Sequence, residues 1–185
     1  KLAAPQTIEK GINLFELIVD YPCADENQKL MLWQIFRGSC VAHWSTIPRA
    51  FRSLIAQLAE ALEESRASLP PESESTEDKD ADQVDLSGQK LGIYTLTEGA
   101  GRRAKNVLAE LFPGLNVELN HDKVATSALD NLAKTADYFV FTDKSAAHQA
   151  YYRLKDMRGD DLIYPSGKGS TSIIRKFMET VDQMS

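Results

Sequence analysis

The stretch Asp137-Tyr-Phe-Val-Phe-Thr142 decides the fold of the second half of the chain. Its aromatic and β-branched residues lie between two polar segments, which is the pattern of a short buried β-strand. Helical patterns flank it on both sides, and further strand patterns alternate with helices at short spacing. Strands are expected at residues 91–96, 116–120, 137–142 and 161–164, and helices at 102–112, 124–135, 145–157 and 170–182. This alternation predicts an α/β fold: a four-stranded parallel, Rossmann/flavodoxin-like sheet of order 2-1-3-4 with helices on both faces.

Residues 1–69 have a wholly helical pattern. Thr7 is expected to cap the first helix, and Asp25 a second helix that ends at Gly38. A third helix is expected to begin near Thr46. Each helix has an apolar stripe that must be covered, so we predict a small all-α domain in front of the α/β domain.

A polar segment, residues 70–85, separates these two patterns. It holds seven acidic residues, one lysine and almost no apolar groups, so we predict an acidic disordered linker between a helical domain at 1–69 and a Rossmann-like domain at 86–185. The net charge of −6 divides into −1, −6 and +1 over these three parts. Because neither folded part is strongly basic, bulk charge does not favour a polyanion as partner.

The composition favours a cytoplasmic protein. No apolar run approaches the roughly 20 residues that span a bilayer, so no membrane partner is expected. The two cysteines, Cys23 and Cys40, lie in apolar helical patterns, where buried reduced thiols are favoured over a disulfide. No Cys/His cluster has metal-ligand spacing, so no metal site is predicted. The first residue is lysine rather than methionine, which favours a part of a larger protein or complex.

Ligands of doubly wound sheets bind beyond the carboxyl ends of the strands, where the strand order reverses. Three polar loops are expected to meet there, at residues 97–103, 142–148 and 165–172. The first contains Gly99-Ala-Gly101-Arg-Arg-Ala104, a formal match to GxGxxA between a strand and a helix. Gly99 and Gly101 would let backbone amides approach a phosphate, with Arg102 beside them. A plain flexible turn is the alternative interpretation, because Glu98 places a negative charge at the same point.

The other two loops supply cations and hydroxyl groups. Lys168, Ser170 and Thr171 lie where the last helix begins, and glycine, lysine and hydroxyl groups at a helix start suit an anion. Alternatively, Ser170 or Thr171 caps that helix without any ligand. Thr142 and Lys144 follow the third strand and border the same edge. We therefore predict an anion-binding site there, without naming a cofactor.

An acid–base pair is a further interpretation of the same edge. His148 follows Asp143 by about one helical turn, and a histidine near a carboxylate is suited to proton transfer. No recognisable motif places a serine or cysteine nucleophile beside this pair. His148 and Asp143 are therefore catalytic candidates only, and a structural histidine is the favoured alternative.

Several stretches of the second half resemble a known domain family. They are Ala136-Asp-Tyr-Phe-Val-Phe-Thr-Asp143, His148, Tyr164-Pro-Ser-Gly-Lys-Gly-Ser170 and Ser172-Ile-Ile-Arg-Lys176. From Gly92 onwards the chain is similar to a bacterial Rossmann-like domain family without an established function. Members are often fused to other modules, so the resemblance implies an accessory or sensory role.

Three functions follow from these patterns. The first is an accessory or regulatory module that binds an anionic ligand, a nucleotide or a nucleic-acid phosphate, at the carboxyl edge of the sheet, within a larger bacterial protein or complex. The second is a protein–protein interaction module without a ligand, which predicts an apolar patch on the helical domain. The third is an enzyme that uses His148 and Asp143. More of the patterns favour a binding module than an enzyme.

Overall fold

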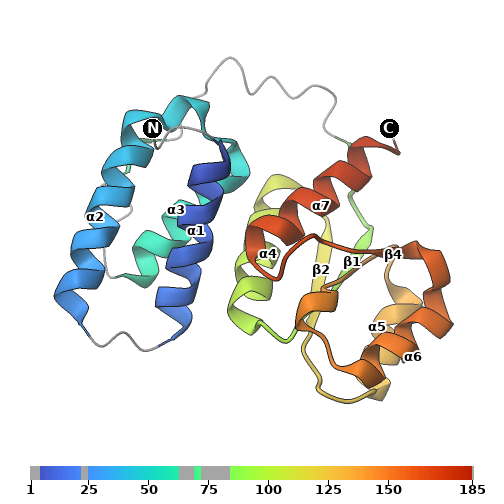
Figure 1. Cartoon of the computed structure of the whole chain (residues 1–185). Coiled ribbons are helices and arrows are strands. Elements are labelled where there is room, and N and C mark those ends of the chain that lie inside the picture. The colour runs from blue at the N-terminus through green and yellow to red at the C-terminus, as the bar shows by residue number, and fades with distance from the viewer. Residues whose placement is uncertain (1–4, 22–24, 63–68, 72–83, 185) are drawn as a thin grey trace. The chain divides into compact units, whose positions relative to one another are not determined.

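The computed structural model describes residues 5–21, 25–62, 69–71 and 84–184. The chain divides into two compact units, Lys1–Gln83 and Val84–Ser185, which Figure 1 shows as a helical and an α/β part. Most of the predicted acidic linker, residues 72–83, lies outside the described residues. The finer division at 69/70 and 85/86 stays a prediction.

The helical unit contains three helices, α1 (Pro5–Asp20), α2 (Glu26–Ala42) and α3 (Arg49–Ala61), with a short 3-10 turn, η1 (Trp44–Thr46). Its core holds Phe15 against Trp33 and Phe36, with ring centroids 5.1 and 5.2 Å apart. Gly11 permits this packing, because a Cβ there would lie only 2.1 Å from Cε2 of Phe36. The unit therefore forms around an aromatic cluster between α1 and α2.

Of the helix ends expected in this unit, one is confirmed and three are wrong. Asp25 caps α2, where its carboxylate accepts a hydrogen bond from the backbone N–H of Gln28 at 3.0 Å. Thr7 lies inside α1, which already begins at Pro5. Gly38 does not end α2, because that helix continues to Ala42. Thr46 belongs to the 3-10 turn, and the N-cap of α3 is Pro48.

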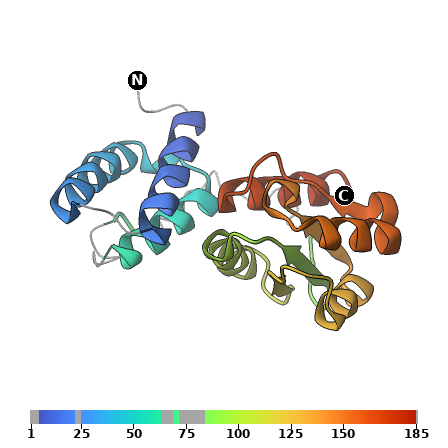
Figure 2. The same cartoon turned by 60° about the horizontal axis from the view of Figure 1, so that its bottom comes forward.

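The sheet of the α/β unit has the predicted order. Its strands are β1 (Lys90–Tyr94), β2 (Asn116–Asn120), β3 (Tyr138–Phe141) and β4 (Leu162–Ile163), all parallel in the order β2-β1-β3-β4. Helices α4 (Glu98–Leu111) and α7 (Ser170–Asp182) pack together, as do α5 (Ser127–Thr135) and α6 (His148–Arg158). Figures 1 and 2 show the first pair on one side of the sheet and the second pair on the other. The predicted Rossmann/flavodoxin-like fold with helices on both faces is confirmed.

The two faces of the sheet have separate apolar layers. Towards α5 and α6, Tyr94 stacks on Phe141 with ring centroids 5.2 Å apart, and Phe139 is fully buried in the same cluster. Towards α7, Phe177 meets the edge of Tyr138 at 5.5 Å. Side chains of a strand alternate between faces. The odd-numbered residues of β3 therefore serve one layer and the even-numbered residues the other.

Arg158, at the end of α6, fastens the end of α5 to the beginning of β3. Its Nη1 donates to the carbonyl oxygens of Ala133 and Ala136 at 2.8 and 2.7 Å, and its Nη2 to that of Asp137 at 3.2 Å. The last carbonyl groups of a helix have no partner within the helix. One guanidinium group therefore satisfies acceptors from two consecutive elements.

Several expected bounds in this unit are also corrected. The predicted loop 97–103 is wrong, because α4 begins at Glu98, where a carboxylate in the first turn suits the helix dipole. Helix α5 begins at Ser127 because Thr126 caps it, accepting a hydrogen bond from the N–H of Leu129 at 3.2 Å. Helix α6 begins only at His148, since residues 143–145 form a 3-10 turn, η3 (Asp143–Ser145).

Candidate anion-binding site

Two buried threonines end the central strands at the carboxyl edge of the sheet. The register pairs Tyr94 of β1 with Phe141 of β3, so Thr95 and Thr142 come next on neighbouring strands. Strand alternation directs Thr142 to the face that α4 and α7 cover. Thr95 lies on that face too, because a Cβ on Gly101 of α4 would lie 2.9 Å from its Cγ2. The pair lies where the strand order reverses.

The two threonine hydroxyl groups differ in their partners. Thr95 is 2% exposed, and its hydroxyl oxygen accepts a hydrogen bond from the N–H of Thr97 at 3.2 Å. Thr142 is fully buried, and its Oγ1 has no hydrogen-bond partner among the described residues. A buried polar group without a partner costs roughly 1–3 kcal/mol. Thr142 therefore marks a position where a polar ligand group would be stabilising.

Helices α4 and α7 both begin at this edge and on this face. The first N–H groups of a helix lack partners within it and, with the helix dipole, favour an anion. Ser170 and Thr171, in the first turn of α7, are fully buried. The N-cap of α7 is Gly169, so the expectation that Ser170 or Thr171 caps the helix is wrong. We call Thr142, Ser170, Thr171 and the amino end of α7 the anion cradle.

Two cations hold the loop after β4 in place. The ammonium group of Lys144, in η3, donates a hydrogen bond to the carbonyl oxygen of Ser166, and Arg175 of α7 donates to the Ser166 hydroxyl group at 3.1 Å. Both Ser166 and Arg175 lie in stretches quoted above, but the sequence predicts neither contact, because the partners come from other elements. Lys168 and Arg102 are exposed and make no hydrogen bond or ion pair with a described residue, so these cations are available to a ligand.

Gly99 and Gly101 do not form the predicted flexible turn. Both are buried residues of α4. Gly101 is required for packing, since a side chain there would collide with Thr95. The formal GxGxxA match therefore describes the contact of α4 with the sheet, and any approach to a phosphate would use the helix N–H groups rather than a loop.

The edge next to β2 holds a network that sequence patterns described only in part. The Asp122 carboxylate accepts hydrogen bonds from the Thr126 hydroxyl group and, at 2.9 Å, from the Asn120 side-chain amide. These two donors lower the pKa of Asp122. Its carbonyl oxygen accepts from the Tyr94 hydroxyl group at 2.8 Å. The network fixes the loop between β2 and α5.

The proposed acid–base pair is not assembled in the structure. Asp143 and His148 are both exposed, and the Asp143 carboxylate accepts a hydrogen bond from the N–H of Lys144 at 2.8 Å. No hydrogen bond or ion pair joins Asp143 to His148 in the described part of the chain. A chemical role for the pair stays a prediction. The described residues also contain no group of three or more His, Cys, Asp or Glu suited to a metal ion.

The sheet topology and the residues at the carboxyl edge of the sheet define a class of protein: a doubly wound α/β domain with a candidate anion cradle, preceded by a helical unit. The chain belongs to the DpdD-like family, whose model matches residues 1–176. This family is linked to the Dpd system, a multi-protein system that acts on DNA and modifies it. The match also covers the helical unit, for which the sequence patterns indicated no relative. No curated protein and no solved structure matches the chain.

One further finding concerns membranes. Among the residues that the structure describes, no helix has the length and apolar character required to cross a bilayer.

Proposed function

We propose that the α/β unit of this DpdD-like protein binds an anionic ligand, a nucleotide or a nucleic-acid phosphate, in the anion cradle. The protein would then act as an accessory or regulatory module of DNA modification. The observation that carries the proposal is the buried hydroxyl group of Thr142, which has no partner among the described residues. A phosphate oxygen accepts hydrogen bonds from hydroxyl and backbone N–H groups, so it would satisfy both Thr142 and the start of α7.

The exposed cations near the edge support the same ligand class. Lys168 follows β4 and Arg102 lies in the second turn of α4, and both are exposed. Opposite charge attracts a phosphate even where the domain as a whole is nearly neutral. Lys144 would act differently, by holding the Ser166 loop in place. We therefore expect Lys168 and Arg102 to affect affinity and Lys144 to affect the shape of the cradle.

The test is ligand binding by the full chain and by two variants at one position. Inorganic phosphate, ADP, and single- and double-stranded oligonucleotides are titrated by calorimetry. The Thr142→Ser variant keeps the hydroxyl group and should bind like the natural chain, whereas Thr142→Val should lose about tenfold in affinity, as expected for one lost hydrogen bond to a charged group. A DNA ligand would also show a steep salt dependence, and a small nucleotide a shallow one. Equal affinity of all three chains would refute the cradle.

The helical unit favours a second function, docking on another protein. Leu14 and Leu17 of α1 are 50% and 48% exposed, and Tyr21, directly after this helix, is 62% exposed. Met31 and Ile35 of α2 are 55% and 58% exposed. Exposed apolar side chains repeated along two helices of one small unit favour a protein partner. Leu17→Glu with Ile35→Glu should abolish association with another Dpd protein, while Thr142→Val should leave it intact; unchanged association in the first variant would refute this function.

A further inference from the structure

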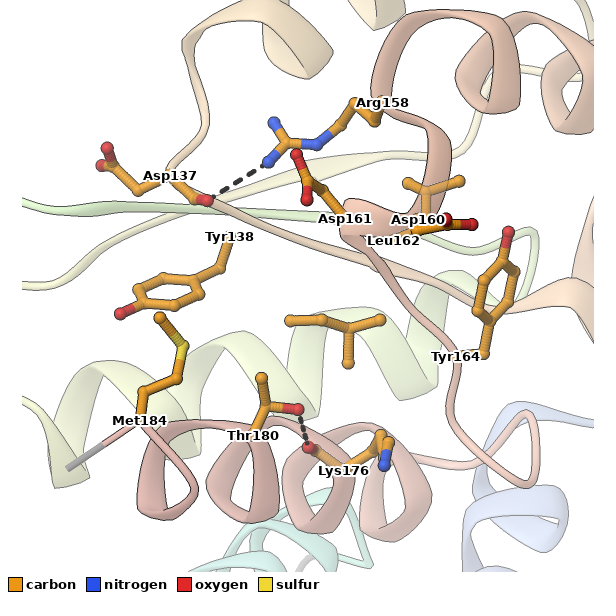
Figure 3. Close-up of a pocket in the computed structure, with 11 residues that line it drawn as sticks. Asp137, Tyr138, Arg158, Asp160, Asp161, Leu162, Tyr164, Lys176, Thr180 and Met184 are labelled. Carbon is orange, nitrogen blue, oxygen red and sulfur yellow. Dashed lines mark hydrogen bonds between the residues drawn. The ribbon is translucent and has the colours of Figure 1, made fainter.

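A groove of about 560 Å³ runs along β4, at the outer edge of the sheet (Figure 3). Tyr138 and Met184 lie at one end of it and Tyr164 at the other. Thr180 of α7 forms part of the opposite wall. The groove is distinct from the anion cradle. The cradle lies at the amino end of α7, whereas the groove is lined by Lys176 and Thr180, further along this helix, and by Met184 beyond it.

The strand beside this groove is unpaired on one side. β4 is the last strand in the sheet order and pairs only with β3, through Phe139 with Leu162 and Val140 with Ile163. Apart from this pairing with β3, no backbone hydrogen bond joins β4 to another segment among the described residues. An edge strand offers N–H and C=O groups to an additional extended chain, which is a recurrent way of binding peptides.

The charge that remains available in the groove is negative. Asp160 and Asp161 are exposed and form no hydrogen bond or ion pair with any described residue. The two cations in the groove are already engaged. The guanidinium group of Arg158 holds three carbonyl oxygens, and Lys176 lies 3.6 Å from the Glu179 carboxylate. A partner with lysine or arginine side chains therefore complements the groove.

We propose that this groove binds an extended, basic segment of a partner protein, which adds to β4 as a fifth strand. Apolar side chains of the segment would face Tyr138 and Met184, and its lysine or arginine side chains would reach Asp160 and Asp161. A second copy of the chain is a poor occupant, because it would bring the same two aspartates together, and like charges across paired strands are destabilising. The acidic residues 70–85 are a poor occupant for the same reason.

The test uses the full chain, labelled with ¹⁵N, and two blocked pentapeptides. One alternates valine with lysine and the other valine with glutamate. The lysine peptide should shift the backbone amide signals of Leu162, Ile163 and Tyr164, and the glutamate peptide should not. N-methylation of alternate peptide nitrogens should abolish these shifts, because it removes the main-chain donors that strand addition uses.

Variants separate the contribution of the two aspartates in the groove from a general effect of removing negative charge from the chain. Asp160→Asn with Asp161→Asn should weaken the lysine peptide by about tenfold, as expected for two exposed ion pairs. Asp156→Asn, an exposed carboxylate of α6 that does not line the groove, should change nothing. Thr142→Val should also leave peptide binding intact, so failure of the anion cradle and failure of this groove are distinguishable. Equal binding of both peptides, shifts confined to other residues, displacement by single-stranded DNA, or an unaffected double variant would each overturn the proposal.

Discussion

Replacing Thr142 with valine exchanges a hydroxyl group for a methyl group at a fully buried position. The hydroxyl group has no hydrogen-bond partner among the described residues, which costs roughly 1–3 kcal/mol. The methyl group adds the transfer free energy of about one buried carbon, about 0.8 kcal/mol. Together these two contributions should raise the free energy of unfolding of the α/β unit by about 2–4 kcal/mol in Thr142→Val. In a domain of this size each kcal/mol raises Tm by roughly 4–8 °C.

The neighbouring threonine provides the matched control. Thr95 is 2% exposed and lies on the adjacent strand and the same face, but its Oγ1 accepts a hydrogen bond from the N–H of Thr97. Thr95→Val is the same chemical change and removes this acceptor. It should lower the free energy of unfolding by about 1 kcal/mol. If the free energy of unfolding rises in Thr142→Val and falls in Thr95→Val, the added hydrophobic methyl group cannot be the only cause, because both threonines are buried.

The sequence provides separate optical probes for the two units. Both tryptophans, Trp33 and Trp44, lie in the helical unit, whereas all tyrosines except Tyr21 lie in the α/β unit. Thermal unfolding followed by near-UV circular dichroism of tyrosine should show the shift in Thr142→Val, and tryptophan fluorescence should show none. An unchanged or lower Tm of the tyrosine transition would mean that the hydroxyl group is already satisfied in the folded chain. That result would remove the observation on which the anion cradle rests.

Three other perturbations have expected outcomes. In a urea titration, Arg158→Ala should lower the free energy of unfolding by about 2–4 kcal/mol, because three carbonyl groups lose their donor. The control, Arg153→Ala, removes an exposed ion pair with Asp130 and should lower it by less than about 1 kcal/mol. Burial raises the pKa of Cys40 to about 12. In a Cys23→Ser variant, a thiol reagent at pH 8 should therefore label Cys40 only as the chain unfolds. Rapid labelling of the folded chain would contradict this prediction. Hydrogen bonds lower the pKa of Asp122 in the folded chain, so its stabilising contribution is present above the unfolded-state value of about 3.9 and is lost as the pH falls through the folded-state pKa. In Asp122→Asn, the free energy of unfolding should therefore fall less steeply as the pH is lowered below about 4. An unchanged pH dependence would mean that these hydrogen bonds do not stabilise the Asp122 carboxylate.

The fold was predictable because each of its elements has a strong local pattern. The alternating stretch at residues 116–120 and the apolar run at 138–141 are strands within a residue or two of the predicted bounds, and α7 has the expected bounds. The bounds of α4 were not predictable, since Gly99 and Gly101 weaken the helical pattern locally. Contact of Gly101 with Thr95 outweighs that preference, and this contact joins two elements that only the fold brings together.

The candidate site was predictable as a place but not as a set of contacts. Strand order placed the ligand edge between β1 and β3, and Thr142, Lys168, Ser170 and Thr171 lie on the loops and helix start that follow β3 and β4. Sequence patterns gave Thr142 and Lys144 as ligand-binding residues and His148 as a catalytic candidate, without distinguishing buried from exposed side chains. Burial separates them, because His148 and Lys144 are exposed whereas the Thr142 hydroxyl group is enclosed.

Local pattern alone thus specifies the alternation of strands and helices, the parallel sheet and the edge at which its loops converge, because strand and helix periods depend only on neighbouring residues. Tertiary structure decides which side chains at that edge have partners. The unpaired Thr142 hydroxyl group, the hydrogen bond from Lys144 to Ser166 and the groove beside β4 all depend on residues far apart in the sequence. Hydrogen bonding and burial are relations between such residues, so they exist only once the strands have paired and the helices have packed on the sheet.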